Sequence, residues 1–298
     1  MVIAKGKTLS INGFQKKGNK GFGIIALMLV NSIYDRRFNM TILYFSATGN
    51  SLAVAKRIGG ELISIPQAIK ANQYEYADDV IGFVFPTYCC YPPKIVRDFL
   101  RKAKLTANYL FAIATYGNAM GNGGDGAEML EFGKLAQAAG YEFQYLNSIL
   151  MVDNFIDNFD INKEIEKIPS KKIEDSIDAI LADIVSRKNY TKEPGLSGKA
   201  ITFVCRSLVK NQDKGLMAQS FTVNENCVSC GICSKVCPVG NINIDGGKPQ
   251  FGTSCLGCYA CLHNCPEIAI HKVKEKSEKR WRHPEVSLSE IIEANTMR

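Results

Sequence analysis

The C-terminal part of this chain contains CVSCGICSKVCP at residues 227–238 and CLGCYACLHNCP at residues 255–266. Both segments follow the pattern C-x2-C-x2-C-x3-C-P, and the second repeats the first 28 positions later, from Cys227 to Cys255 onward. Eight of the 11 cysteines belong to these two runs. Disulfide frameworks typically occur in small secreted domains that lack a sufficient core. The repeat therefore predicts a duplicated half-domain that binds metal through thiolates in a reducing compartment, the cytoplasm.

The two runs resemble those of two-cluster bacterial ferredoxins. In that family the first three cysteines of a run bind one 4Fe–4S cluster and the fourth binds the other cluster. The resemblance implies two 4Fe–4S clusters, one held by Cys227, Cys230, Cys233 and Cys265, and one held by Cys237, Cys255, Cys258 and Cys261. Zinc is the alternative, but zinc sites typically use separated cysteine pairs or add histidine, which fits two complete four-cysteine runs poorly. His263, inside the second run, is a candidate donor to a cluster sulfur.

Residues 40–190 alternate short apolar runs with helical patterns. The apolar runs predict strands at 41–45, 61–65, 80–85, 109–115 and 148–152. The helical patterns lie at 51–58, 94–104, 127–139 and 171–187. Strands that alternate with helices form parallel sheets covered on both faces. We therefore predict a doubly wound α/β domain with a five-stranded parallel sheet over residues 40–190, followed by a small α+β domain over residues 219–275.

A hydroxyl-rich loop, SATGNS at residues 46–51, follows the first predicted strand. It puts hydroxyls and backbone amides at a helix N-terminus, where the helix dipole favours an anion. The lysine of an ATP-binding Walker loop and the G-x-G-x-x-G of a dinucleotide site are both absent. The loop resembles the flavodoxin phosphate loop, Ser/Thr-x-Thr-Gly-Asn-Ser/Thr, which binds the FMN 5′-phosphate without a cation. That resemblance implies an FMN site at Ser46, Thr48, Gly49, Asn50 and Ser51; the alternative is a simple helix cap.

Two further loops, at residues 86–93 and 115–126, end at the same edge of the predicted sheet. Ligands of doubly wound sheets bind at this edge, where the strand order reverses. We expect Tyr88 and Tyr116 to stack on the flavin ring, and backbone amides near Gly117 and Asn118 to meet its polar edge. The alternative is that both tyrosines are ordinary loop aromatics.

Three cysteines lie outside the two runs. We interpret Cys89 and Cys90 as small apolar residues, with a redox role as the alternative because they lie in a predicted flavin loop. We expect Cys205 to be buried rather than reactive.

The charge of the chain is unevenly distributed. The formal net charge is +7, but residues 1–39 hold seven basic residues and one acidic residue, so the remainder is close to neutral. This gives no reason to expect nucleic-acid binding. No apolar stretch approaches the roughly 20 residues that a membrane-spanning helix needs, so we predict no membrane span.

The ends and the connection between the domains have their own patterns. Residues 1–39 are interpreted as a basic extension that is disordered or lies before the true start of translation. Residues 191–218 are a predicted connector with one short amphipathic helix near 199–209, and the 118–126 loop is a candidate lid. Residues 276–298 are predicted to form a C-terminal tail with a docking helix near 288–294.

Together the motifs resemble the flavodoxin-plus-bacterial-ferredoxin fusion family, which is found mainly in anaerobes. The resemblance covers residues 40–275 and implies electron transfer between FMN, two clusters and redox partner proteins. Outer-sphere electron transfer needs no catalytic acid or base, and we predict no catalytic residue. The alternative is a flavin-dependent reductase of a small molecule, fed by its ferredoxin domain. The MVDNF stretch at residues 151–155 also resembles a Met-Pro-x-Asn-Tyr-like stretch of that family; because two residues differ, no role is transferred to it.

Overall fold

The computed structural model of this protein describes residues 39–117, 126–195, 205, 209–210 and 213–297. The chain divides into two units, and all described residues belong to the second, residues 39–298. Three predictions fall outside the described residues: the basic extension, almost all of the candidate lid with Asn118, and most of the connector helix.

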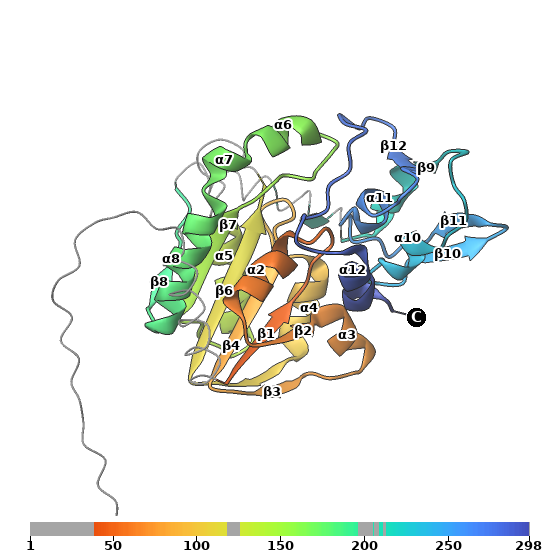
Figure 1. Cartoon of the computed structure of the whole chain (residues 1–298). Helices are drawn as coiled ribbons and strands as arrows, with labels where there is room; N and C mark the ends of the chain where they lie inside the picture. Colours follow the sequence, from red (N-terminus) through yellow and green to blue (C-terminus); the bar gives the residue numbers. More distant parts are fainter. Residues whose placement is uncertain (1–38, 118–125, 196–204, 206–208, 211–212, 298) are drawn as a thin grey trace, which may run out of the picture. The chain divides into compact units, whose positions relative to one another are not determined.

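A parallel sheet organises the first domain, which we call the sheet lobe (Figure 1). Neighbouring strands pair in parallel throughout, in the order β2-β1-β4-β6-β7-β8. Their bounds are β1 (Met40–Tyr44), β2 (Glu61–Ser64), β4 (Val80–Pro86), β6 (Tyr109–Tyr116), β7 (Tyr145–Leu150) and β8 (Tyr190–Thr191). The first five follow the order 2-1-3-4-5, which is the flavodoxin-like doubly wound order. The predicted fold class is confirmed.

Two details of the sheet differ from the prediction. The two-residue strand β8 extends the predicted five strands, because it pairs with the start of β7. β7 itself begins at Tyr145, three residues before the predicted start. The ring of Tyr145 is fully buried, and its hydroxyl donates to Asp183 Oδ2 at 3.0 Å. That tertiary contact fixes a strand start that the local pattern around Asn147 obscured.

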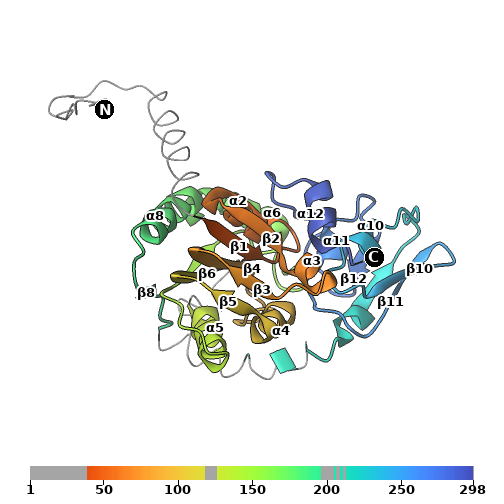
Figure 2. The same ribbon diagram turned by 90° about the horizontal axis from the view of Figure 1, so that it is seen from below.

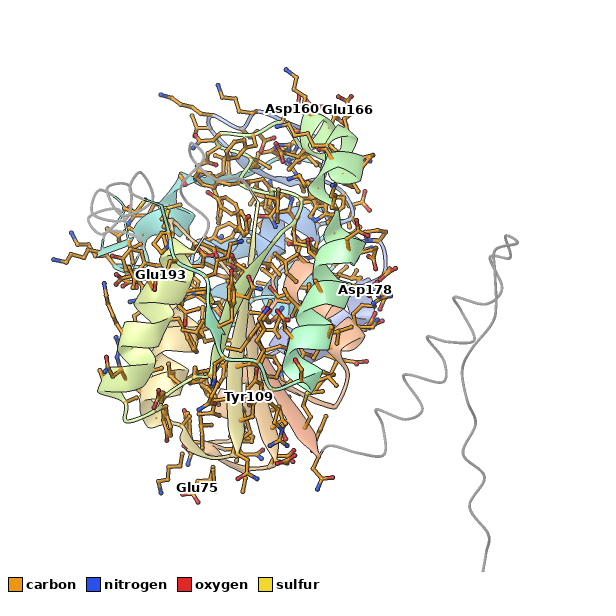
Figure 3. All side chains as sticks on the ribbon, turned by 90° about the vertical axis from the view of Figure 1, so that its left-hand side faces the viewer. Glu75, Tyr109, Asp160, Glu166, Asp178 and Glu193 are labelled. Carbon is orange, nitrogen blue, oxygen red and sulfur yellow. The ribbon has the colours of Figure 1, made fainter. Side chains whose placement is uncertain are left out.

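Helices cover both faces of the sheet (Figure 2). One face carries α2 (Asn50–Ile58) and α8 (Ile173–Val185), and the other carries α4 (Lys94–Lys102) and α5 (Ala127–Ala138). α8 buries Ile177, Ile180 and Ile184, whereas Asp178 lies on its exposed side (Figure 3). This helical period buries one face of α8 against the sheet.

Smaller elements complete the sheet lobe. A separate two-stranded parallel sheet pairs β3 with β5. The remaining bounds are α3 (Ile65–Lys70), β3 (Glu75–Ala77), β5 (Lys104–Thr106), α6 (Ile161–Glu166) and α7 (Ile168–Lys171).

The cysteine runs form a second, small α+β region, which we call the cysteine lobe. β9 pairs with β12 and β10 with β11, both antiparallel. A four-residue helix follows the second cysteine of each run. The bounds are η1 (Leu216–Ser220), β9 (Phe221–Val223), α10 (Ile232–Lys235), β10 (Ile242–Asp245), β11 (Lys248–Phe251), α11 (Ala260–His263) and β12 (Ile270–Lys272).

The core of the cysteine lobe is shared with the sheet lobe. Val152 and Ile156, from the segment after β7, pack in one buried cluster with Phe221, Leu262 and Trp281. The stretch after β7 therefore belongs to the packing of both lobes.

Residues 276–297 form what we call the C-terminal segment, which returns to the sheet lobe. It ends in α12 (Leu288–Asn295), which opens with a capping box between Ser287 and Glu290. Glu290 Oε1 also accepts from Lys56 Nζ on α2 at 2.8 Å, and Ala294 O accepts from Ser64 Oγ at the end of β2. The predicted docking helix is thus present, and it contacts α2 and the end of β2.

Among the residues that the structure describes, every helix falls short of the length and apolar character that crossing a bilayer requires.

Candidate functional site

The eight cysteines of the two runs line two separate small cavities. The first cysteine group consists of Cys227, Cys230, Cys233 and Cys265. The second cysteine group consists of Cys237, Cys255, Cys258 and Cys261. The structure thus brings together the two sets of four that the resemblance to two-cluster ferredoxins implies, with the last cysteine of each run exchanged between them. In the described part of the chain, no three side chains of the metal-binding types are arranged to hold a single metal ion.

The first cysteine group lies near the surface. Cys230 is exposed, and the cavity is also lined by Val228 and Ile244. Val228 is 63% exposed and Ile244 is 36% exposed. Ala269 N donates to Cys265 Sγ at 3.3 Å, a bond of the kind that stabilises a thiolate ligand. A metal site here would face a partly apolar, accessible surface.

The second cysteine group is more enclosed. Cys237 and Cys261 are buried, and Phe221, Leu256 and Tyr259 line the same cavity. Backbone amides again point at sulfur, because Asn241 N donates to Cys237 Sγ at 3.2 Å and Gly257 N donates to Cys255 Sγ at 3.3 Å. Similar ligand sets therefore sit in two different environments.

His263 lies in the second run but does not bind a sulfur. Its Nε2 donates to Asn154 O at 2.8 Å, and Trp281 N donates to its Nδ1 at 3.2 Å. Burial lowers the pKa of His263 to about 4, so the ring is neutral at pH 7. Because both ring nitrogens are occupied, the expected bond from His263 to a cluster sulfur is wrong. The ring instead ties the second run to the segment after β7.

The 46–51 loop is buried at the N-terminus of α2. Gly49 N donates to Ser46 Oγ at 3.1 Å, and Gly49 has φ +96°. A Cβ at Gly49 would lie 2.9 Å from His283 Cβ, so the C-terminal segment, as well as the left-handed φ, requires glycine here. No side chain caps α2. The loop therefore begins α2 at a glycine N-cap, without a side-chain cap.

The carbonyls of the loop are hydrogen bonded to the C-terminal part of the chain. Ser46 O accepts from Asn295 Nδ2 at 2.9 Å. Ala47 O accepts from Asn264 Nδ2 at 3.1 Å, and Thr48 O accepts from His283 N at 2.8 Å. Asn264 directly precedes Cys265, so the loop is in direct contact with the second cysteine run.

The amides of the same loop remain available. The first helical bond of α2 runs from Ala53 N to Gly49 O at 2.8 Å. Within the described residues, no acceptor pairs with the amides of Asn50, Ser51 and Leu52, which precede it. Buried amides of this kind at a helix N-terminus suit an anion.

The side chains of the loop join it to both neighbouring regions. Thr48 Oγ1 accepts from Asn154 Nδ2 at 2.6 Å, and Asn154 O is the acceptor for His263. Asn50 Oδ1 accepts from Trp281 Nε1 at 2.9 Å. Asn154 and Trp281 were not predicted as site residues; Asn154 belongs to the MVDNF stretch, to which the resemblance transferred no role. Ser51 Oγ lies 2.8 Å from Thr115 Oγ1 at the end of β6.

Tyr88 lies between the loop and the second cysteine group. Its ring centroid is 6.4 Å from that of Phe45, which directly precedes the loop. The Tyr88 hydroxyl and Thr87 Oγ1 are buried without a hydrogen-bond partner among the described residues. Burial raises the pKa of Tyr88 well above its ordinary value, and the nearby Cys258 and Cys255 raise it further. Tyr88 therefore lies close to both the loop and the second cysteine group.

Tyr116 and Gly117 end β6 in a different setting. Lys192 Nζ lies 5.3 Å from the centroid of the Tyr116 ring. Gly117 O accepts from Lys171 Nζ at 3.0 Å, and a Cβ at Gly117 would lie 2.4 Å from Asp153 Cα. Gly117 is thus required by close backbone packing against the segment after β7.

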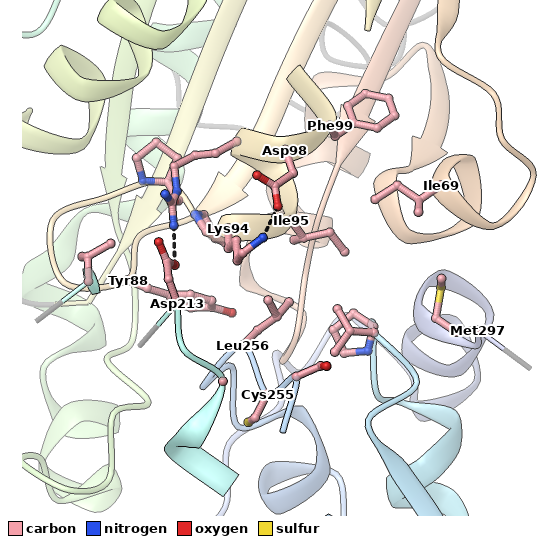
Figure 4. A pocket seen from close by; sticks show the side chains of 18 of the residues that line it. Ile69, Tyr88, Lys94, Ile95, Asp98, Phe99, Asp213, Cys255, Leu256 and Met297 are labelled. Atoms are coloured by element: carbon pink, nitrogen blue, oxygen red, sulfur yellow. Dashed lines mark hydrogen bonds and ion pairs between the residues drawn. The ribbon is translucent and has the colours of Figure 1, made fainter. Parts of the chain in front are cut away.

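A cavity of about 440 Å³ opens beside Tyr88 (Figure 4). Cys255 and Leu256 line it from the cysteine lobe, and α4 contributes Lys94 and Phe99. The cavity therefore reaches a residue of the second cysteine group from the surface of the sheet lobe.

Comparison with known sequences identifies part of the cysteine lobe. Residues 222–243 match the family described as 4Fe-4S binding domain. The chain is 42% identical over 55 residues to pyruvate synthase subunit PorD of Methanocaldococcus jannaschii, covering 18% of this chain and 64% of that protein. It is 34% identical over 50 residues to a ferredoxin-like protein in the nif region of Trichormus variabilis, covering 16% of this chain and 43% of that protein. The chain spans less than two thirds of the length of both relatives.

Solved structures similar to this chain include two small proteins. A flavoprotein of Lactobacillus acidophilus, solved in complex with FMN, has a TM-score of 0.25 at 15% identity, covering 45% of this chain and 99% of that one. The Trp repressor binding protein of Bacillus subtilis has a TM-score of 0.28 at 12% identity, covering 38% of this chain and 84% of that one. Such distant similarity adds nothing to the strand order, which defines the fold by itself. The chain joins a flavodoxin-like parallel sheet to a C-terminal 4Fe–4S binding domain.

Proposed function

We propose that this protein is an electron relay that binds FMN at the 46–51 loop and one 4Fe–4S cluster in each cysteine group. The observation that carries the proposal is the contact between the two halves: Asn264, which ends α11 between Cys261 of the second group and Cys265 of the first, donates to Ala47 O in the loop. An electron passing between the cysteine lobe and a flavin at this loop would cross only packed protein.

The residues of the sheet lobe fit FMN. The unpaired amides of Asn50 and Ser51 suit a phosphate without a cation. The unpartnered Thr87 Oγ1 and Tyr88 OH are polar atoms that a bound isoalloxazine ring could satisfy. Bound FMN would exchange one or two electrons, whereas a 4Fe–4S cluster passes one. In this proposal the chain supplies position and hydrogen bonds, and no side chain acts as an acid or base.

The surroundings of the two cysteine groups support an order of transfer. Cys230 of the first group is exposed, so this group is suited to exchange electrons with a redox partner protein. The second group has Tyr88 beside it and is suited to exchange electrons with the flavin. The proposed path is therefore partner protein, first group, second group, FMN, in either direction.

Analysis of anaerobically purified protein tests this proposal. We expect about eight iron and eight sulfide per chain, together with one FMN, and a redox titration in which flavin and cluster signals change separately. Stoichiometric zinc without sulfide would overturn the cluster assignment. Full iron and sulfide with no flavin binding, even after incubation with excess FMN, would overturn the flavin half alone.

A second candidate function is a reductase that is fed by the cysteine lobe and acts on a small molecule. The cavity of about 440 Å³ favours it, because a molecule there would lie against both Tyr88 and Cys255. Replacing the half-buried Ile69 on its wall with tryptophan would reduce the free space. A reductase of this kind should then lose turnover of its acceptor, whereas electron transfer to a partner protein should continue unchanged.

A further inference from the structure

The three cysteines outside the metal-binding runs form a group of their own. Cys205 Sγ lies 3.6 Å from Cys90 Sγ, although 115 positions separate the two residues in the chain. Cys205 is 1% exposed and packs with Cys90, Tyr91 and Val209 in a small buried cluster. Two thiols in van der Waals contact are close enough that a modest shift could join them, since a disulfide has a sulfur–sulfur distance of about 2.05 Å.

The backbone at this position is unusual. Cys89 has φ +48° and Cys90 has φ +61°, two consecutive non-glycine residues in the left-handed region. Such residues are uncommon, and they concentrate at functional sites because the surrounding structure must hold them there. In this turn Cys89 is exposed and Cys90 is half-buried against Cys205. Two consecutive left-handed residues are what a two-residue hairpin turn between Tyr88 and Tyr91 requires, and this turn places Cys90 against Cys205.

We propose that Cys90 and Cys205 are a redox-active dithiol that closes to a disulfide by exchange with a low-molecular-weight disulfide. The Cys90 thiolate attacks one sulfur of the small disulfide, which breaks its S–S bond, forms a mixed disulfide at Cys90 and releases one thiolate. Cys205 then attacks Cys90 Sγ, forms the Cys90–Cys205 bond and releases the second thiolate. The two protons of the protein thiols end on the two released thiols. Two protein thiols are oxidised, and one small disulfide is reduced.

The accessibility of the thiols sets this order. Cys90 is the partly exposed member of the pair, so the small disulfide reaches it first, and the buried Cys205 acts as the resolving thiol. Burial, and after it the nearby Cys205, raises the pKa of the Cys90 thiol, and Glu128 and Cys89 act in the same direction. Both residues are therefore protonated thiols at neutral pH. Because little thiolate is present, the exchange with a small disulfide is slow.

The bridge would act on the loop that carries Tyr88. Tyr88 and Tyr91 are joined by backbone bonds in both directions, Tyr88 N to Tyr91 O at 2.9 Å and Tyr91 N to Tyr88 O at 3.0 Å. Cys90 lies inside this closed turn, so a bond between Cys90 and Cys205 would restrain the turn that begins at Tyr88. The dithiol would thus couple thiol redox state to the residue beside the second cysteine group.

Thiol mapping on the anaerobic holoprotein tests the inference. The protein is incubated with hydroxyethyl disulfide, quenched with an alkylating agent, digested, and sequenced by fragmentation mass spectrometry, with iron content measured in parallel. We expect loss of two free thiols per chain, a linked peptide that joins Cys90 to Cys205, unchanged iron, and full reversal by dithiothreitol. A bridge that contains Cys89, or a stable mixed disulfide without any internal bridge, would overturn the inference.

Three variants sharpen the test. Cys89→Ser is the matched control and should still form the bridge at the wild-type extent. Cys90→Ser should lose no pair of thiols, and Cys205→Ser should stop at a mixed disulfide on Cys90. If Cys205→Ser fails to fold, the mapped bridge in the wild-type protein and in Cys89→Ser decides the question. A bridge lost in Cys89→Ser would show that Cys89 is the true partner.

Discussion

The two cysteine groups share one spacing, yet they occupy different surroundings. The first group includes the exposed Cys230 and faces the half-exposed hairpin of β10 and β11. The second group is packed among Phe221, Leu256 and Tyr259, with Tyr88 of the sheet lobe beside it. The internal repeat produces two similar cysteine groups, and Tyr88 of the sheet lobe lies near Cys255 and Cys258 of the second. The comparison teaches that the two copies of a duplicated motif acquire different surroundings when they meet different neighbours.

The largest expected effect comes from removing Cys237, the cysteine that the first run contributes to the second group. Cys237→Ser should lose about four of the eight iron atoms, and the surviving cluster should have the spectrum seen in Cys258→Ser. Cys237 lines the second cavity although it belongs to the first run. Electron paramagnetic resonance of the reduced variants makes the measurement.

Cys230→Ser provides the contrasting variant. It should also lose about four iron atoms but leave the other cluster, with the complementary spectrum. If Cys237→Ser matched Cys230→Ser instead, the exchange of the fourth cysteine between the groups would be disproved.

The next effect concerns Asp153, in the segment after β7 that packs against the cysteine lobe. Burial, the largest cause, raises the pKa of Asp153 from 3.8 to about 6. Its protonated form therefore stabilises the fold fully below pH 3.8, and this contribution is lost as the pH rises through about 6. Asp153→Asn keeps an acceptor for Phe155 N and removes the ionisation.

The free energy of unfolding, measured by urea titration, should therefore become larger for Asp153→Asn than for wild type as the pH rises. We expect the gain over wild type to grow by about 1 to 3 kcal/mol between pH 4 and pH 8. The exposed Asp175→Asn is the matched control. A gain that stays constant with pH would contradict the burial of this carboxyl.

A smaller effect is expected from the hydroxyl that links the loop to the second run. Thr48→Val removes the acceptor for Asn154 Nδ2 and a hydroxyl beside the proposed phosphate. FMN affinity, measured by fluorescence quenching, should fall about tenfold, the value of roughly one hydrogen bond to a charged group. Thr106→Val, on the exposed strand β5, should bind FMN normally. Equal affinities in the two variants would argue against the loop as the phosphate site.

The smallest effect belongs to the surface of the first group. Val228 is 63% exposed and lines the first cavity. Val228→Asp should slow reduction by a redox partner protein a few-fold, about 2- to 5-fold, because it places a charge in an apolar docking surface. The rate with the small reductant dithionite should be unchanged. Equal slowing with both reductants would point to damage at the cluster rather than at a docking surface.

Local patterns predicted most of the fold. The alternation of strands and helices gave the parallel sheet, and the apolar runs located β1, β4 and β6 to within one residue of the bounds in the structure. The short strands β8, with two residues, and β3 and β5, with three each, were missed. Strands of this length depend on pairing with a partner strand rather than on their own sequence pattern. The connections at the site were missed for the same reason. Asn295 donates to Ser46 O across 249 positions, and no local pattern encodes such a pair.

The amino-acid sequence by itself determined the motifs: the spacing of eight cysteines, the hydroxyl-rich loop after the first strand and the alternation of strands with helices. These features depend on residue type and short intervals, which a linear chain contains in full. Only the tertiary structure decided that Asn264 contacts the 46–51 loop, that His263 binds Asn154 O rather than sulfur, and that Cys90 meets Cys205. The physical reason is that these contacts join residues more than 100 positions apart, so their geometry arises only when the whole chain folds.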